Sequence, residues 1–454
     1  MKRLKLSFTP IFILMFIFSS GDEIMAQTES EKVFTLKESI EYALSHSQDM
    51  RIADYEMENA ENQIKEIRST GLPQVNAYAK LEDNLKLPTQ ILPGELIGEP
   101  GGTVPVQFGV QYVATAGVQF NQLIFNKSYL IGLEAARTSK EYYALNKIKT
   151  EESVIYHVSA NYYRTLYIQE QLKVVDQNLE RLTQLLKIME VRANNDLVRQ
   201  VDLNRVKVSK TNLQTQKSNL VTQLEQQKNL LKYSMGMTTE DSITLDNKSI
   251  GSFDEQMVSS LQAINSNTRT EIKLLEKQKE LNTLNDKNIK AGYYPSLSLY
   301  GGYNYVGQQN ELGELFNNEW FDAAMIGIRL DIPIFDGFQK KYRSAQAKVN
   351  QSIIDENMSK TKTYISLEQE TAQSTLKNSL ENLEAQHENM LLAEKVYDQQ
   401  NSLYKEGVIQ LIDLLDAETA LREAQTGYNT GLINVKLAEL ELIKANGNLN
   451  TLNQ

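Results

Sequence analysis

The apolar positions of this chain follow two spacings, one typical of long α-helices and the other of two-faced β-strands. Helical spacing is clearest in a run that steps by three and four: Leu172, Val175, Leu179, Leu182, Leu186 and Met189. This seven-residue repeat is typical of a coiled-coil seam. Near the C-terminus a large and a small residue alternate along the seam: Leu414, Ala417, Leu421, Ala424, Tyr428, Gly431, Val435, Ala438, Leu442 and Ala445. The small residues allow neighbouring helices to approach closely.

The positions of glycine and proline show how far these helices extend. Neither residue occurs in 133–235 or in 338–406, so each stretch is predicted to be helical. The first is interrupted at Asn194-Asn195-Asp196 and the second ends at Lys405-Glu406-Gly407, residue types that tolerate a left-handed backbone. The predicted helices cover residues 35–69, 126–193, 202–233, 261–290, 337–404 and 413–446.

The lengths of these helices predict how they pack. At 1.5 Å per residue, two of them are about 100 Å long and the other four about 50 Å. A long helix flanked by two half-length helices finds partners for all its side chains only if the short ones stack end to end beside it. The result is a column of about 100 Å, which is longer than a globular domain is wide.

Strand spacing is clearest between Phe108 and Phe120, where even positions are apolar and several odd positions, including Gln119, are polar. A second strand alternates Ala324 to Ile332 with Gly327, Arg329 and Asp331. Residues 296–305 and 72–81 supply two more strands. Long strands with one apolar and one polar face are typical of transmembrane barrels, where the faces meet lipid and a water-filled lumen.

This interpretation places Gln119, Arg329 and Asp331 in a barrel lumen. Trp320, the only tryptophan, lies at a strand end and is predicted to be a membrane-interface anchor. The alternative is that aromatic residues are simply frequent in β structure. Four strands cannot close a barrel, since the smallest bacterial barrels need eight, so the chain is expected to oligomerise, and a trimer would supply twelve.

The order of elements occurs twice, which indicates an internal duplication. Thr70-Gly71-Leu72-Pro73 recurs as Gly292-Tyr293-Tyr294-Pro295, and 197–202 recurs as 408–413. The predicted organisation is a signal peptide at 1–26, a first repeat at 27–236, a connector at 237–260 and a second repeat at 261–454. The signal combines Lys2, Arg3 and Lys5 with a short apolar run and ends at Ala26.

Composition excludes several classes of function. The chain carries 47 basic and 58 acidic residues, a net charge of −11, which argues against nucleic acid as a partner. It has no cysteine, which excludes disulfides, thiolate metal sites and cysteine nucleophiles. His46, His157 and His387 lie far apart along the chain, and there is neither a nucleophile elbow nor a phosphate-binding glycine loop. We therefore expect no enzyme activity, no catalytic residues, no metal and no cofactor.

These features together resemble a known family. The signal sequence, the duplicated plan of helix, two strands and long helix, and the segment from Leu403 to Ala417 are similar to the TolC-like outer-membrane efflux proteins over essentially the whole chain after residue 26. The segment Leu403–Ala417 resembles the family's periplasmic helix-turn-helix tip.

The resemblance implies an α+β fold, mainly α, in which four strands per protomer contribute to a twelve-stranded outer-membrane barrel. It implies a homotrimer in contact with outer-membrane lipid. Long helical hairpins would form an α-barrel in the periplasm, with an equatorial belt at 237–260 and the C-terminal end. The implied partners are a periplasmic adaptor protein and an inner-membrane pump, and the implied function is a passive exit duct for efflux or type I secretion.

The resemblance also implies a gate at the tips. The family's acidic constriction corresponds to Asp202, Asp413 and Asp416, with Tyr404 as an aromatic partner. Like charges in a narrow mouth raise the energy of the closed state, so we expect gating to be sensitive to protons and divalent cations. The alternative is that Asp202 and Asp413 are N-caps of the returning helices.

Two departures from the family pattern limit what can be carried over to the gate. Asp196 stands where the family usually has glycine, and Ile409 stands where some members have an arginine that ties the gate shut. The salt-bridge part of the family's closing mechanism is therefore not carried over.

Docking onto the adaptor would use the apolar and glycine residues of the turns, namely Leu197, Val198, Gly407 and Val408. The alternative role for these residues is packing between adjacent tips.

Two other functions compete with the channel. A periplasmic adaptor should have one helical hairpin between small β-rich domains, whereas this chain has two hairpins. A surface stalk has no need of Arg329 and Asp331 between aliphatic residues. The sequence does not select the cargo, the pump class, the adaptor or the role of the loops at 83–107 and 307–319.

Overall fold

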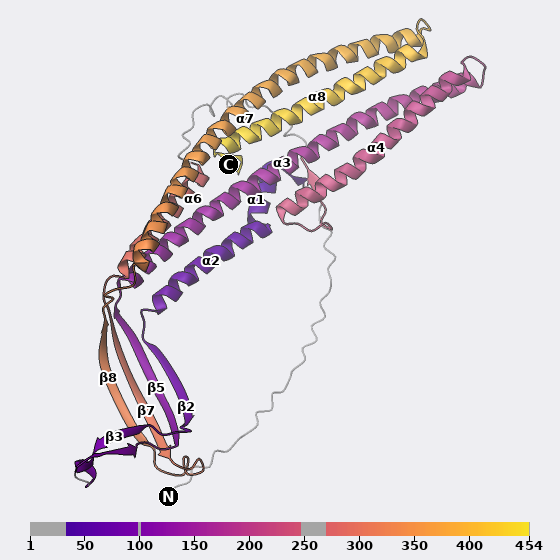
Figure 1. The fold of residues 1–454 in the computed structure, drawn as a ribbon. Coiled ribbons are helices and arrows are strands. Elements are labelled where there is room, and N and C mark those ends of the chain that lie inside the picture. The colour runs from indigo at the N-terminus through magenta and orange to yellow at the C-terminus, as the bar shows by residue number, and fades with distance from the viewer. Residues whose placement is uncertain (1–32, 99–100, 247–268, 454) are drawn as a thin grey trace.

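The computed structural model describes residues 33–98, 101–246 and 269–453 of the 454-residue chain. The predicted signal peptide and most of the predicted connector lie outside these residues. The molecule is elongated, with a sheet at one end from which a long bundle of helices extends (Figure 1). No helix in the described part of the chain has a stretch both long and apolar enough to cross a membrane.

The helices agree closely with the spacing of apolar residues. α3 and α7 are each 67 residues long, and α3 starts after Asn126, whose side chain caps it by accepting a hydrogen bond from the Tyr129 amide. The helices are α1 (Leu36–His46), α2 (Gln48–Ser69), α3 (Lys127–Ala193), α4 (Gln200–Met235), α6 (Thr270–Ala291), α7 (Gln339–Lys405) and α8 (Leu411–Ala445).

One helix prediction is wrong, because residues 35–69 form two helices rather than one. Ser47 has an extended backbone, with φ −64° and ψ 147°, and its hydroxyl caps α2 by accepting from the Met50 amide. Serine competes for backbone hydrogen bonds in this way, which favours a helix end over a helix interior. The break lies where α4 ends, so that α4 and α2 follow one another along α3 (Figure 1).

Gly236 lies where the end of α4 meets the junction between α1 and α2. It closes α4 in the left-handed conformation, with φ +79°, and a Cβ at this position would lie 2.6 Å from the carbonyl oxygen of His46 and 2.7 Å from Cα of Ser47. Glycine is therefore required both by the backbone conformation and by the close approach of the α1–α2 junction.

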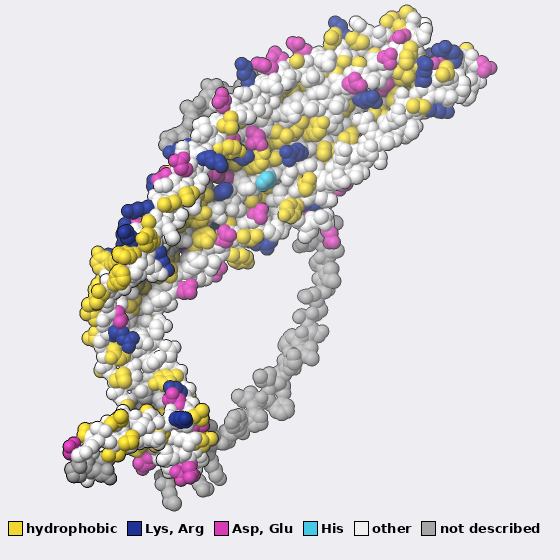
Figure 2. Space-filling model, in the orientation of Figure 1, with side chains coloured by type: hydrophobic (Ala, Val, Ile, Leu, Met, Phe, Trp, Pro, Cys, Tyr) yellow, Lys and Arg dark blue, Asp and Glu magenta, His cyan; other side chains and the backbone are white. Residues whose placement is uncertain are grey.

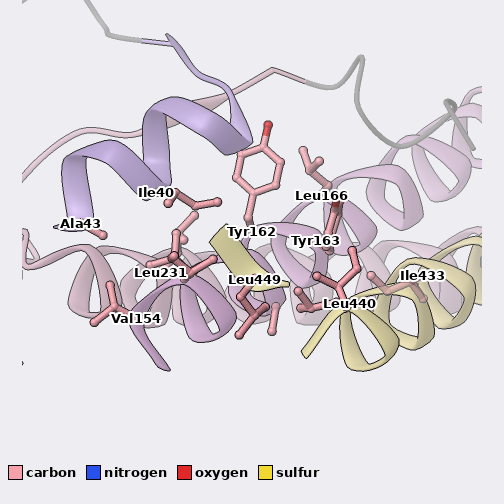
Figure 3. Close-up of a cluster of buried hydrophobic side chains, with 14 of the residues drawn as sticks. Ile40, Ala43, Val154, Tyr162, Tyr163, Leu166, Leu231, Ile433, Leu440 and Leu449 are labelled. Atoms are coloured by element: carbon pink, nitrogen blue, oxygen red, sulfur yellow. The ribbon is translucent and has the colours of Figure 1, made fainter. Parts of the chain in front are cut away.

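The largest core lies midway along the bundle, where α1, α3, α4 and α8 meet (Figure 3). Tyr162 of α3 is fully buried there, and its hydroxyl donates to the backbone oxygens of Phe34 and Asp246. These residues belong to or adjoin β1 (Val33–Phe34) and β6 (Thr244–Leu245), which pair in parallel. The core is completed by Leu449, in the short helix η4 (Leu449–Asn453).

A buried arginine holds α6, α7 and α8 together near this core. Arg269 is 6% exposed, and its guanidinium binds Glu271 at the start of α6 and Glu368 of α7. Its Nη1 also donates to the backbone oxygen of Ala445, at 2.6 Å, where α8 ends. Arginine suits this position because its planar group donates several hydrogen bonds in fixed directions.

The sheet at the other end has four antiparallel strands in the order β2-β5-β7-β8. The strand predicted from Phe108 begins only at Tyr112, because Gly109 has φ +113° and bends the chain. The predicted loop at 83–107 contains a β-hairpin and the short helix η1 (Gly94–Ile97). The strands are β2 (Gln74–Asp83), β3 (Thr89–Pro93), β4 (Thr103–Gln107), β5 (Tyr112–Phe125), β7 (Ser296–Gln309) and β8 (Phe321–Asp331).

The contact at Gly236 predicts a strong effect of one methyl group. Gly236→Ala should lower the stability of the purified protein by about 3 kcal/mol, through backbone strain plus the clash with His46 and Ser47. Gly407→Ala is the matched control, since Gly407 has φ +77° but no atom within 4 Å of an added Cβ, and it should cost only about 1 kcal/mol. Thermal unfolding followed by circular dichroism measures both, and equal losses would contradict the close packing at Gly236.

Candidate functional site: the two-faced sheet and the hairpin tips

The strand register places the three predicted lumen residues on one face of the sheet. Gln119 is opposite Gly302, while Ser298 is opposite Arg329 and Ser296 is opposite Asp331. Alternate residues of a strand share a face, so these positions all lie on the same side. The side chains of Gln119, Arg329 and Asp331 are exposed there. The same face carries further polar residues: Asn76, Lys80, Thr115, Asn121 and Asn304.

The opposite face of the sheet is apolar and exposed. Ile326 and Ile328 of β8 are 74% and 67% exposed, and Val75 of β2 is 65% exposed. Figure 2 shows hydrophobic side chains gathered at this end of the molecule, over the sheet and its junction with the helices. An apolar surface of this extent is a sign of contact with lipid or protein. The sheet thus has one face suited to water and one suited to an apolar environment.

Trp320 lies at the end of the sheet far from the helices. Its indole nitrogen donates to the backbone oxygen of Leu315, at 3.0 Å, and its ring covers Gly307, where a Cβ would come within 2.8 Å of it. The side chain is half-buried by this contact. Its role as a membrane-interface anchor stays a prediction.

The two hairpin tips have the same backbone geometry. In the α3–α4 turn the Leu197 amide donates to the Arg192 oxygen at 2.9 Å, and in the α7–α8 turn the Val408 amide donates to the Leu403 oxygen at 2.9 Å. The residue before each amide is left-handed: Asp196 has φ 59° and Gly407 has φ 77°. Asp196, the departure from the family pattern, therefore takes the glycine-like conformation, at a cost of about 1 kcal/mol.

The three predicted gate carboxylates have different surroundings. Asp413 and Asp416 are exposed in the first two turns of α8, and Asp413 accepts a hydrogen bond from the Gln410 amide at 3.1 Å. Asp202 is only 8% exposed. Its carboxylate binds Arg199 at 2.8 Å and lies 3.7 Å from Arg205.

The N-cap alternative for Asp202 and Asp413 is wrong. The N-caps of α4 and α8 are Arg199 and Gln410, and each aspartate lies three residues further on, at the third helical position. There the carboxylate binds the cap residue, through the Arg199 side chain in one tip and the Gln410 amide in the other. The arginines three residues on either side of Asp202 were a usable signal that sequence reasoning missed.

Tyr404 joins the two tips of one chain. Its hydroxyl donates to the Met189 sulfur at 3.1 Å, and its ring packs against a core formed by Met189, Leu203 and Leu411, among others. Burial raises the pKa of Tyr404, and the charge of Asp202 adds to the shift. Because its hydroxyl is held by α3, Tyr404 does not contact Asp413 or Asp416 through a hydrogen bond in the described part of the chain.

The predicted docking residues separate into two groups. Leu197 and Val408 are 72% and 66% exposed, and Gly407 is also exposed. Val198 instead packs against the tip core between the two hairpins, in agreement with the alternative role of packing. No group of three or more His, Asp or Glu side chains within the described ranges could hold a metal ion.

This difference between neighbours predicts different mutant phenotypes. Val198→Asp should loosen the tips by about 1–2 kcal/mol, because it places a charge without a partner against an apolar core. Leu197→Asp should leave them unchanged, because its side chain already faces solvent. Limited proteolysis of the two turns, compared between variants, measures the effect, and equal cleavage rates in both would contradict the assignment of Val198 to the core.

Known proteins share both sequence features and the fold. Residues 287–448 match the family model described as outer membrane efflux protein. Outer membrane protein TolC of Vibrio cholerae is 20% identical over 338 residues, covering 74% of this chain and 77% of its own length.

Solved structures of three outer-membrane proteins have the same fold. MtrE of Neisseria gonorrhoeae, in its open state, superposes with a TM-score of 0.70 at 18% identity, over 92% of this chain and 90% of its own. CmeC of Campylobacter jejuni superposes with a TM-score of 0.68 at 16% identity, over 97% and 94%. VceC of Vibrio cholerae gives 0.66 at 17% identity, over 91% and 96%. By the family match over the second repeat, the relation to TolC and the shared fold, the chain is similar to the TolC-like outer-membrane efflux proteins.

Proposed function

We propose that three copies of this chain form a continuous duct, with a twelve-stranded barrel in the outer membrane and a helical tunnel in the periplasm. The observation that carries the proposal is the four-stranded sheet, which has a polar face, an exposed apolar face and two open edges. β2 pairs only with β5 and β8 only with β7 in the described part of the chain. Backbone groups in lipid need partners, so an open sheet there requires further copies to close it.

Exposed apolar residues on the helices support the same assembly. α7 carries a row of them on the outside of the bundle: Tyr342, Val349, Ile353, Tyr364 and Leu367, each more than half exposed. On α4, Val201, Val208 and Leu230 lie on one face, and each is at least half exposed. Such rows at coiled-coil spacing find partners when the α7 side of one protomer meets the α2–α4 side of the next.

The mouth of the tunnel would be lined by Asp413 and Asp416. Both are exposed and lie one turn apart on α8, whereas the charge of Asp202 is offset by two arginines. Three protomers would therefore bring six uncompensated carboxylates together. Their repulsion raises the energy of a narrow mouth, which protons or divalent cations would lower. The gate then depends on the second hairpin more than on the first.

Transport through such a duct needs no chemistry, so its energy must come from a partner. An inner-membrane pump would deliver the substrate through a periplasmic adaptor that docks at the exposed tip residues Leu197, Gly407 and Val408. An adaptor function for this chain itself is less well supported, because both hairpins continue into the sheet. A stalk would not need the polar sheet face.

The acidic mouth predicts the ion selectivity of the channel. The purified trimer in planar bilayers should conduct ions with a preference for cations, because fixed negative charge concentrates them at the narrowest point. Asp413→Ala plus Asp416→Ala should reduce the ratio of cation to anion permeability several-fold. Single-channel recordings under a salt gradient measure this ratio.

Glu423→Ala is the control, since Glu423 is exposed on the same helix but lies outside the tip, and it should keep the wild-type selectivity. Conducting channels with unchanged selectivity in the double variant would exclude the acidic gate while retaining the duct. An absence of conductance from folded, membrane-inserted protein in every form would overturn the duct itself and favour the adaptor or stalk.

A further inference from the structure

Glu418 is a buried carboxyl group that the channel proposal does not use. It lies on α8, seven residues after the helix begins, and is only 8% exposed. Its Oε1 has no hydrogen-bond partner among the described residues. Within the same residues no lysine, arginine or histidine nitrogen lies within ion-pair distance of it. Burying an acid in this way is costly unless the group is neutral or its surroundings change.

The surroundings of Glu418 come from three helices of both hairpins. The charges of Arg181 on α3 and Arg422 on α8 act to lower the pKa of Glu418. The charge of Glu418 in turn acts to raise the pKa of Tyr397 on α7. The Arg181 guanidinium lies 5.3 Å from the centre of the Tyr397 ring. Asp398 of α7 is a further charged group near this cluster, and its charge acts on Tyr397.

Arg181 is itself incompletely satisfied. Its Nη2 donates to Asn178 at 2.8 Å, but its buried Nε has no partner among the described residues. Asn178 in turn reaches Gln425 of α8 at 3.5 Å, so this small polar network crosses from α3 to α8. A carboxyl and a guanidinium that act on one another's charge thus lie on different hairpins, each with a buried polar atom that has no partner among the described residues.

The protonation of Glu418 has a defined effect on packing. Burial raises the pKa of this carboxyl from 4.5 to about 7, even though Arg181 and Arg422 act in the opposite direction. The packed state therefore binds the proton more tightly than a state in which the side chain is hydrated. Packing is most stable when the proton is bound, at low pH, and weakens as the pH rises from about 4.5 to about 7.

We propose that Glu418 is a proton-operated latch between the two helical hairpins of each protomer: protonated, it lets α3, α7 and α8 pack as they do here, and ionised, it drives them apart. The proposal rests on the proposed duct, in which separation of the hairpins widens the tunnel. It is distinct from the acidic mouth, because Asp413 and Asp416 are exposed to solvent whereas Glu418 points into the protein.

The latch can be tested by measuring the separation of the tips. The chain has no cysteine, so Leu197→Cys and Val408→Cys, one at each exposed tip, accept spin labels without background. Trimers assembled with an excess of unlabelled protomer carry one labelled pair each. Pulsed electron paramagnetic resonance should show longer distances at pH 8 than at pH 5. The ratio of protomers with separated tips to protomers with packed tips should change on the order of a hundredfold between pH 5 and pH 8.

Glu418→Gln keeps the shape of the side chain but cannot ionise, so it should hold the short distance at every pH. Glu423→Gln, on the same helix but exposed, should keep the wild-type pH profile. A wild-type profile in Glu418→Gln would overturn the latch. Long distances at every pH in that variant would overturn it as well, because they would mean that the carboxylate holds the hairpins together.

Conductance measurements distinguish a failure of the latch proposal from a failure of the duct proposal. If the duct exists, wild-type conductance should include a rise with pH about a midpoint near 7, and Glu418→Gln should remove this component while keeping the cation preference set by Asp413 and Asp416. A channel that keeps the rise near pH 7 in Glu418→Gln contradicts the latch alone. Loss of conductance in every variant contradicts the duct alone, since the distance measurement still reports whether the hairpins move.

Discussion

Unpaired backbone at the edges of one small sheet is the constraint on which the rest of this structure depends. β2 and β8 each present a row of backbone groups with no partner within the described chain, and the sheet between them has one apolar face. In lipid such groups must be paired, and pairing them requires more strands than one chain supplies. The helices are subject to the same requirement, because the apolar row on α7 and the apolar residues Val201, Val208 and Leu230 on α4 are exposed in the described part of the chain.

The helical part meets this requirement through repetition. Each hairpin pairs a 67-residue helix with a shorter returning helix, and the space beside the remaining half is filled by α2 or α6. Helix ends meet at Gly236 and at Arg269. Gly236 allows the close approach because it has no side chain, and Arg269 binds the end of α8 through its buried guanidinium. Neither residue lies at the hairpin tips, yet both determine how the hairpins are held.

Much of this arrangement could be predicted because periodicity reports local burial. The alternation in β5 and β8 placed Gln119, Arg329 and Asp331 on one face, and the register agrees. A serine at position 47 favours a helix end without requiring one, and the close approach of α4 to this break, far away in sequence, could not be predicted. The packing of Val198 against the tip core could not be predicted, because a turn pattern does not tell which side faces the partner hairpin. The burial of Glu418 could not be predicted either, since a glutamate beside a heptad seam usually faces water.

The equal length of α3 and α7 has a consequence for how such a chain can evolve. Both tips of a protomer lie at the far end of the bundle only while the two long helices keep the same number of residues. An insertion in one of them would displace its tip along the axis and rotate every seam residue beyond it, unless it added a whole heptad, about 10 Å of helix. The returning helix must gain the same heptad for the hairpin to stay paired. Length changes are therefore expected to come as matched heptads in both repeats, so that the length of the helical column varies in steps.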